Sequence, residues 1–289
     1  MVTELTGHGA TWGSALSADE FAAVRSVGFE PVGLVFGAAV YPLFATAAVS
    51  CPGTAAPSRT PSAPGKVTGW AGPGARIAQA LSDGYRTAID RMAGECSGLG
   101  GHGIVGASLQ VTETPGDSFA AATVEFKVTG TAVRGRGCSP LARPFTTELS
   151  GQDFAKLLID GWVPAGIALG IAAAGLHDTL ATTNSGPWGT GNAEVPSYTS
   201  LMIQVRRDAR GRLEQTVREL GADGVVVSAM TLRVRSEACH AHLAGADHFA
   251  EAVIIGTAVA RFADRPGARR PPSLAVLRLD ADEVPDSPS

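Results

Sequence analysis

A chain of 289 residues is longer than one typical small domain and accommodates two domains of about 100–150 residues each, with tails left over. Hydrophobic residues make up 45% of the chain and charged residues 17%, so it can build apolar cores but has few charges for solvation. This surplus of apolar surface favours assembly. The net charge of −4 and the absence of a long Lys/Arg run argue against nucleic acid as a partner.

The expected compartment is the cytoplasm. Four cysteines occur without a C-x-x-C pair, which is typical of a protein without a disulfide framework or zinc knuckle. The first residues carry neither the basic nor the apolar segment of a secretory signal. The stretch from Pro31 to Ser58 has no charge and is long enough to cross a bilayer, but Pro42 and Pro52 interrupt it. We interpret it as a strand followed by a loop, and expect no membrane partner.

The predicted elements of the first half are a short helix, a strand, a long helix and two strands. Apolar residues recur every three or four positions along the long helix, and Gly100 stands where a left-handed residue commonly ends a helix. Ser17 is placed to cap the short helix. In chain order the elements are Asp19 to Val27, Pro31 to Phe36, Gly74 to Leu99, Ile104 to Thr112 and Thr123 to Val133. A Pro/Ser/Thr-rich insertion near 52–65 precedes the long helix.

The same order of elements returns in the second half. Ser150 and Gly221 take the places of Ser17 and Gly100. The predicted elements are Asp153 to Ile159, Pro164 to Leu169, a helix from Leu201 to Leu220, Val225 to Val234 and Ala250 to Val259. The strands of both halves are short and rich in β-branched residues.

Three blocks of sequence match between the halves in the same order. The matched residues are Phe21, Gly28, Pro31, Gly33 and Gly37 with Phe154, Gly161, Pro164, Gly166 and Gly170; Arg91, Leu99 and Gly100 with Arg212, Leu220 and Gly221; and Glu125, Gly130 and Thr131 with Glu251, Gly256 and Thr257. Three matches in one order make chance resemblance improbable. The sequence therefore predicts an α+β fold, a tandem repeat of two βαββ units that are each preceded by a short helix.

The predicted organisation has five parts. A tail (1–14) precedes the first unit (15–137), a linker (138–147) joins it to the second unit (148–262), and a Pro-rich acidic tail (263–289) is predicted to be disordered. Within this tail, the apolar island from Leu274 to Leu279 is predicted either to contact a protein partner or to fold back onto its own domain.

The junction Leu220-Gly-Ala-Asp-Gly-Val-Val-Val227, followed by Gly256-Thr-Ala-Val259, resembles the YbjQ family of heavy-metal-binding proteins. The first half resembles the family through Leu99 to Gly106 and Gly130 to Val133. The resemblance implies a small dodecin-like α+β unit, self-association into a ring-like homo-oligomer, often a pentamer, and binding of heavy-metal ions. These implications are expectations about this chain.

The sharpest metal-ligand candidates lie in one hairpin of the second half. Thiolate and imidazole suit zinc, copper or nickel, and His240 and His242 would project to one side of an extended segment. The alternative is a solvated loop with incidental histidines, because the first half has no counterpart. The candidate ligands of a divalent transition metal such as zinc are Cys239, His240, His242 and His248.

Other chemistry-bearing residues favour structural roles. Gly101 to Gly106 matches G-x-G-x-x-G, but it lies between a helix and a strand, the reverse of the order that a dinucleotide site needs. Cys96 falls on the apolar helix face and is interpreted as a packed core thiol, and His102 as a polar turn residue. Glu125 and Glu251 share one strand position and are interpreted as solvated carboxylates or a subunit-facing pair.

The first functional hypothesis is a non-enzymatic, cytoplasmic homo-oligomer of YbjQ-like units that binds heavy-metal ions. A second is a structural scaffold or partner-binding module without metal that uses the C-terminal tail as its contact. A third is a small-molecule enzyme with a site between the units, which would need clustered titratable groups there. No catalytic motif of the common hydrolase, metalloprotease or nucleotide-binding kinds occurs, so the prediction is that the chain is not an enzyme.

Overall fold

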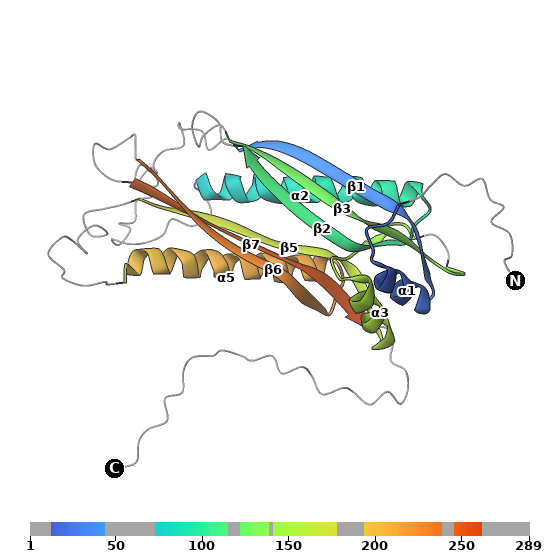
Figure 1. Cartoon of the computed structure of the whole chain (residues 1–289). Coiled ribbons are helices and arrows are strands. Elements are labelled where there is room, and N and C mark those ends of the chain that lie inside the picture. The colour runs from blue at the N-terminus through green and yellow to red at the C-terminus, as the bar shows by residue number, and fades with distance from the viewer. Residues whose placement is uncertain are drawn as a thin grey trace, which may run out of the picture.

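The computed structural model describes residues 13–43, 73–114, 122–138, 141–177, 194–238 and 246–261. These residues form two β-sheets and four helices, which confirms the predicted α+β class (Figure 1). The elements in chain order are α1 (Ala18–Ser26), β1 (Phe29–Leu43), α2 (Pro73–Gly98), β2 (Gly103–Thr114), β3 (Ala122–Gly135), β4 (Phe145–Thr146), α3 (Gly151–Ile159), β5 (Trp162–His177), α5 (Pro196–Glu219), β6 (Gly224–Ala238) and β7 (Ala246–Arg261).

The helices lie within a few residues of their predicted bounds, whereas the strands are longer than predicted. Gly100 and Gly221 follow the long helices with φ of +66° and +65°, as their place after the last apolar residue predicts. Strand β1 continues to Leu43 through an uncharged stretch whose remaining residues lie outside the described part. The insertion near 52–65 and the tail 263–289, with Leu274 to Leu279, also lie outside it. Strand β4 falls in the segment that the sequence assigned to a linker.

The three long strands have the same order in both sheets. Sheet A (β1, β2, β3 and β4) runs β1-β3-β2-β4, and sheet B (β5, β6 and β7) runs β5-β7-β6. The long strands pair antiparallel, and the short β4 pairs parallel with β2. The register of β1 on β3 shifts between Pro31 and Gly33, and that of β5 on β7 shifts between Pro164 and Gly166. A proline cannot donate to the ladder, which accounts for a bulge at both places.

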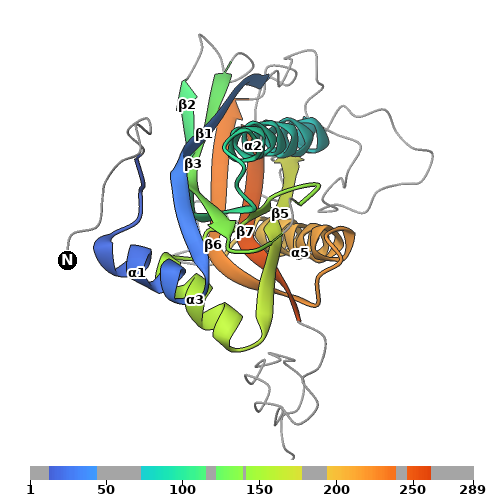
Figure 2. The same ribbon diagram turned by 90° about the vertical axis from the view of Figure 1, so that its right-hand side faces the viewer.

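Helix α2 lies between the two sheets and has two buried sides. One side packs on sheet A and the other on one face of sheet B, whose opposite face is covered by α5, as Figure 2 shows end-on. The core around α2 includes Tyr85, Met92, Phe126, Ile171 and Val253, all of them buried. Side chains alternate along β5, so that Ile171 faces α2 while Ala172 faces α5. Strands β5 and β7 of sheet B are therefore buried on both faces by helices from the two halves, whereas β6 is largely exposed.

Close approach of each long helix to its sheet requires glycine. A Cβ on Gly37 of β1 would lie 2.0 Å from the carbonyl oxygen of Ala88 on α2. A Cβ on Gly170 of β5 would lie 2.2 Å from the carbonyl oxygen of Ala209 on α5. Only a residue without a side chain lets the helix backbone come this near to the strand.

Buried threonines fasten the segment before each short helix. Thr131 of β3 lies with its Oγ1 3.3 Å from the hydroxyl of Ser14, and it accepts a hydrogen bond from the Ala15 N–H at 3.0 Å. In the second half, the Thr257 Oγ1 lies 2.9 Å from the hydroxyl of Thr147 and accepts from the Glu148 N–H at 3.2 Å. Both threonines are at most 1% exposed, so these contacts satisfy buried hydroxyl groups.

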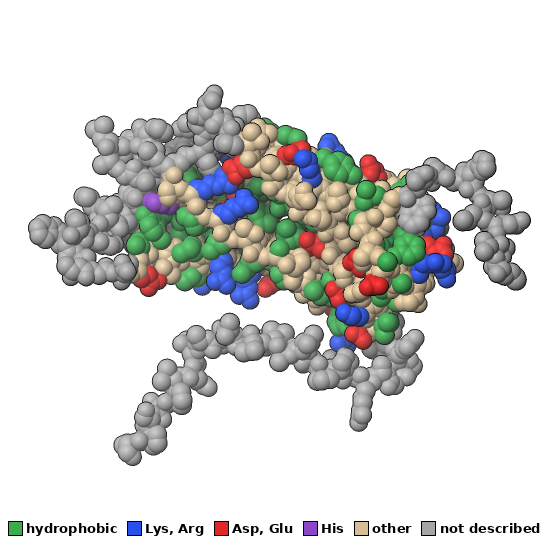
Figure 3. All heavy atoms as spheres, in the orientation of Figure 1, with side chains coloured by type: hydrophobic (Ala, Val, Ile, Leu, Met, Phe, Trp, Pro, Cys, Tyr) green, Lys and Arg blue, Asp and Glu red, His purple; other side chains and the backbone are tan. Residues whose placement is uncertain are grey.

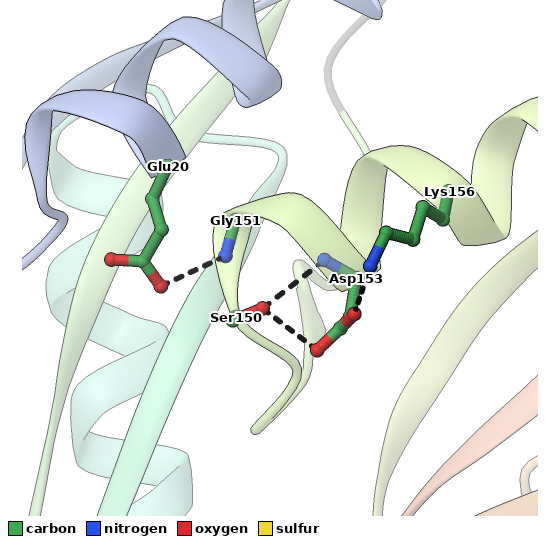
Figure 4. A network of polar contacts seen from close by, with 5 residues as sticks. All are labelled: Glu20, Ser150, Gly151, Asp153 and Lys156. Carbon is green, nitrogen blue, oxygen red and sulfur yellow. Dashed lines mark hydrogen bonds and ion pairs between the residues drawn. The ribbon is translucent and has the colours of Figure 1, made fainter.

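The two short helices meet near their N-termini (Figure 4). The Glu20 carboxylate accepts from the Ser17 N–H at 2.8 Å within α1 and from the Gly151 N–H of α3 at 3.3 Å. Hydrogen bonds to the backbone of Ser17 lower the pKa of Glu20. Ser150 caps α3 by accepting from the Asp153 N–H at 3.1 Å. One carboxylate thus serves the first turn of both helices, where the helix dipole favours negative charge.

Candidate functional site

One of the four predicted metal ligands, His248, lies within the described residues, at the hairpin end of the second half. His248 on β7 places Nε2 2.7 Å from the Tyr198 hydroxyl of α5 and Nδ1 2.7 Å from the Ser236 hydroxyl of β6. The Tyr198 ring also packs against the imidazole, with centroids 4.5 Å apart. Both ring nitrogens are engaged by hydroxyl groups, so His248 links three elements of the second half. The other candidates, Cys239, His240 and His242, lie outside the described residues, and that ligand set stays a prediction.

Among the described residues, no group of three or more His, Cys, Asp or Glu side chains is arranged to hold a metal ion. His102 is buried in the turn that follows α2, and its Nδ1 accepts a hydrogen bond from the Gly135 N–H at 3.1 Å, which links that turn to the end of β3. Cys96 is fully buried, and burial raises the pKa of its thiol to about 11. A thiol of this kind remains protonated at neutral pH and packs as a small apolar group.

The clearest polar site lies between the two sheets and joins the halves. The Arg235 guanidinium of β6 forms a two-pronged ion pair with the Glu113 carboxylate of β2, with its Nη2 2.5 Å from Oε2. The Glu251 carboxylate of β7 lies 4.0 Å from the same guanidinium. We name Glu113, Arg235 and Glu251 the interface charge cluster. Planar two-pronged pairing fixes geometry as well as charge, so the cluster holds β2 of sheet A beside β6 of sheet B.

Burial governs the titration of Glu251. It raises the pKa of Glu251, and the neighbouring Arg235 and Arg233 offset only part of this effect. Burial and the nearby Glu251 raise the pKa of Tyr85 on α2 to about 12. The cavity between these groups has a volume of about 50 Å³, room for little more than a water molecule or two. The arrangement holds sheets together and leaves no room for a substrate.

Sequence reasoning gave Glu125 and Glu251 one shared role, but the structure places them differently. Glu251 lies between the sheets, whereas Glu125 is partly exposed on sheet A and forms an ion pair with Lys127 at 3.0 Å. The sequence did not single out Glu113 or Arg235. The signal in the sequence that could have indicated this ion pair was a charged residue, Glu113 or Arg235, in each of two segments rich in β-branched residues.

Two groups of large apolar side chains are exposed to solvent. The β1 stripe (Leu34, Phe36, Val40) lies on the face of sheet A opposite α2, and the β6 stripe (Met230, Leu232, Val234) lies on the α5 side of sheet B. Their side chains are between 37% and 60% exposed. In Figure 3, hydrophobic side chains reach the surface of the face in view, and basic ones gather along its lower edge over α5. Contiguous apolar surface of this kind marks contact sites for other proteins.

Comparison with known proteins decides the family. No family model matches the chain. Over 230 residues the chain is 30% identical to Encapsulin nanocompartment protein Rv1762c of Mycobacterium tuberculosis (strain ATCC 25618 / H37Rv), a match that covers 74% of this chain and 75% of the relative. The chain belongs to the encapsulin nanocompartment protein family. We interpret the exposed β1 and β6 stripes on the basis of this membership.

Membership in the encapsulin nanocompartment family corrects the first functional hypothesis. The prediction of a heavy-metal-binding protein is wrong, because the relative is named as part of a nanocompartment and His248 has both ring nitrogens in hydrogen bonds with hydroxyls. The metal-free scaffold alternative agrees better with the family. The YbjQ resemblance has no matching family model and stays a prediction. No helix among the described residues is long and apolar enough to span a membrane.

Proposed function

We propose that this protein is a non-catalytic structural component of an encapsulin nanocompartment that associates with further copies of itself. The similarity to a nanocompartment protein over three quarters of both chains carries the proposal. The exposed β1 and β6 stripes support it, because a chain that remained alone would leave both in water. The site between the sheets supports a structural role, since its charges pair with one another around a very small cavity.

We further propose that the chain is two copies of one unit, as the matching sequence blocks predict. The paired bulges at Pro31 and Pro164 support this reading. So do the equivalent close approaches of Gly37 and Gly170 to their helices. A chain that carries two equivalents of one unit presents each kind of unit surface twice, and such a chain is suited to symmetric assembly.

The proposal is tested on the untagged full-length chain. Light scattering at micromolar concentration and negative-stain electron microscopy measure its assembly. Sedimentation of a lysate of the source organism, followed by mass spectrometry, shows whether the chain travels with particles. We expect masses above the monomer and recovery in particle fractions. A chain that is monomeric in pure form and absent from every particle fraction would overturn the proposal.

The predicted contact through Leu274 to Leu279 is tested separately. A chain that ends at Arg261 removes the whole C-terminal tail and leaves the described elements intact. If the tail contacts a partner, the shortened chain keeps its own assembly but is lost from particle fractions. If the tail instead folds back onto its domain, its loss lowers the melting temperature and leaves recovery in particles unchanged.

A further inference from the structure

We propose that α5 and β6 of one copy pack on the open face of sheet A of a second copy, and so repeat between chains the contact made within the chain. This inference rests on the proposed self-association and names the surfaces that carry it. The open face of sheet A is the face opposite α2, on which the β1 stripe lies.

The contact within the chain provides the template. Helix α2 packs against sheet B through Tyr85 and Ile89, where it meets Ile167 and Ile171 of β5. Beside the helix, Val111 of β2 faces sheet B in the same layer. The first half therefore contributes a helix and the adjacent strand face, and the second half contributes one face of its sheet.

The second half presents the same helix and strand face, but uncovered. Strand pairing fixes the equivalence: Leu109 of β2 pairs with Val128, and Met230 of β6 pairs with Ile254, the matching position of the other sheet. Leu109 is packed against the core, whereas Met230 is 54% exposed. The β6 stripe is thus the uncovered counterpart of the strand face that the first half buries.

The first half presents the other side of the same contact. Leu34 and Phe36 of the β1 stripe occupy the positions that Ile167 and Leu169 occupy in β5, given the alignment of the two bulges. In sheet B these positions are covered by α2. In sheet A they are exposed. The two apolar stripes of the chain are therefore the two complementary sides of one kind of contact, and a second copy would join them.

The unpaired edge of β6 is consistent with the proposed contact between two copies. The β4 segment extends the edge of β2, with the Thr147 N–H donating to the Ile104 oxygen at 3.0 Å and the Ala107 N–H donating to the Thr147 oxygen at 2.9 Å. Val105 of that edge is fully buried, but its counterpart Val226 on β6 is 42% exposed. Among the described residues no strand pairs with this edge of β6. The matching segment of a second copy is 13–16, in which Ser14 contacts Thr131 as Thr147 contacts Thr257.

The two surfaces carry complementary charges at equivalent positions. Within the chain, Tyr85 of α2 lies near Glu251 of sheet B. The equivalent positions are Arg206 on the solvent face of α5 and Glu125 on the open face of sheet A. An arginine would therefore meet a glutamate between chains where a tyrosine meets one within the chain.

A charge-reversal cycle tests the contact. Arg206→Glu and Glu125→Arg are each expected to weaken association at least tenfold by light scattering over a concentration series, and the double variant is expected to restore it. Arg76→Glu makes the same change at an exposed position of α2, a helix whose two sides are already covered, and should associate like the unchanged chain. Single variants with unchanged association, or a double variant without recovery, would overturn the inference.

Crosslinking locates the contact independently. Strand neighbours lie about 4.8 Å apart, within reach of a disulfide. In a background with Cys51, Cys138 and Cys239 changed to Ser, Gly13→Cys with Val225→Cys should link chains on mild oxidation. Gly13→Cys with Ile159→Cys is the matched control and should not. An oligomer that persists without the link overturns this contact but leaves the proposed function standing, whereas recovery only as a monomer outside particles overturns both.

Discussion

Gly37 on β1 lies against Ala88 on α2 so closely that a methyl group on Gly37 would stand 2.0 Å from the Ala88 carbonyl oxygen. Gly37→Ala therefore forces helix and strand apart and should lower the free energy of unfolding by about 1–3 kcal/mol. Gly170→Ala, opposite Ala209, should do the same in the second half. Urea denaturation followed by circular dichroism measures both.

Gly94→Ala is the control for these substitutions. Gly94 lies in α2 with no atom within 4 Å of an added Cβ. Alanine there should raise the free energy of unfolding by about 0.5–1 kcal/mol, because glycine is costly inside a helix. Equal effects of Gly37→Ala and Gly94→Ala would contradict the close approach.

The buried hydroxyl of Thr257 should contribute measurably to stability. Thr257→Val keeps the shape of the side chain but removes the acceptor of the Glu148 N–H and the partner of the Thr147 hydroxyl. The Thr147 hydroxyl keeps the hydrogen bond that it accepts from the Leu149 N–H, but the Glu148 N–H loses its acceptor. This loss should cost about 1–3 kcal/mol by chemical denaturation. Thr129→Val, on the partly exposed face of sheet A, is expected to change stability by less than about 0.5 kcal/mol.

Glu251 should make stability depend on pH. Its pKa is raised in the folded state by burial, so the folded chain holds a proton that the unfolded chain has lost once the pH exceeds the ordinary value of 4.5. Its contribution is therefore fully present below that value and is lost as pH rises through the folded pKa. Glu251→Gln has no titrating proton at this position. Its stability relative to the unchanged chain should therefore increase as the pH is raised from 4 to 8. Thermal melts across this range measure the difference, and a constant difference would contradict the assignment.

Cys96 should resist modification in the folded chain. Its thiol is fully buried, and the pKa of about 11 leaves almost no thiolate at pH 8. Cys138 is exposed and should be alkylated by iodoacetamide within minutes. Mass spectrometry of peptides separates the two sites. Denaturant should make their rates similar, and rapid labelling of Cys96 without denaturant would be inconsistent with its place in the core.

Particular residues explain how far the sequence predicts this fold. The glycines after the long helices and the apolar face through Met92 and Cys96 are local signals, and the structure places them as expected. Strand β4 has only two residues and is held by β2, so no local pattern could indicate it. The ion pair of Arg235 with Glu113 joins positions 122 residues apart, and only the packing of the two sheets brings them together.

The site predictions were also limited because a local sequence pattern does not show which distant residues pack together. Cys239, His240, His242 and His248 were grouped because they are close in sequence and have suitable ligand chemistry. His248, however, is directed toward Tyr198, fifty residues earlier, by the packing of α5 on sheet B. The β1 and β6 stripes matched the expected pattern of strands, and their exposure depends on which sheet face each helix covers.

The placement of α2 between two sheets has a consequence for how the polypeptide is divided. Among the described residues, the contacts that hold the first half to the second are noncovalent, and they include α2 on β5, β4 on β2, and Glu113 on Arg235. Two fragments separated near residue 140 and synthesised together should therefore find each other and restore the fold. Either fragment alone would expose an apolar face to solvent and should precipitate or be degraded. We therefore expect the two halves to fold by complementation rather than independently.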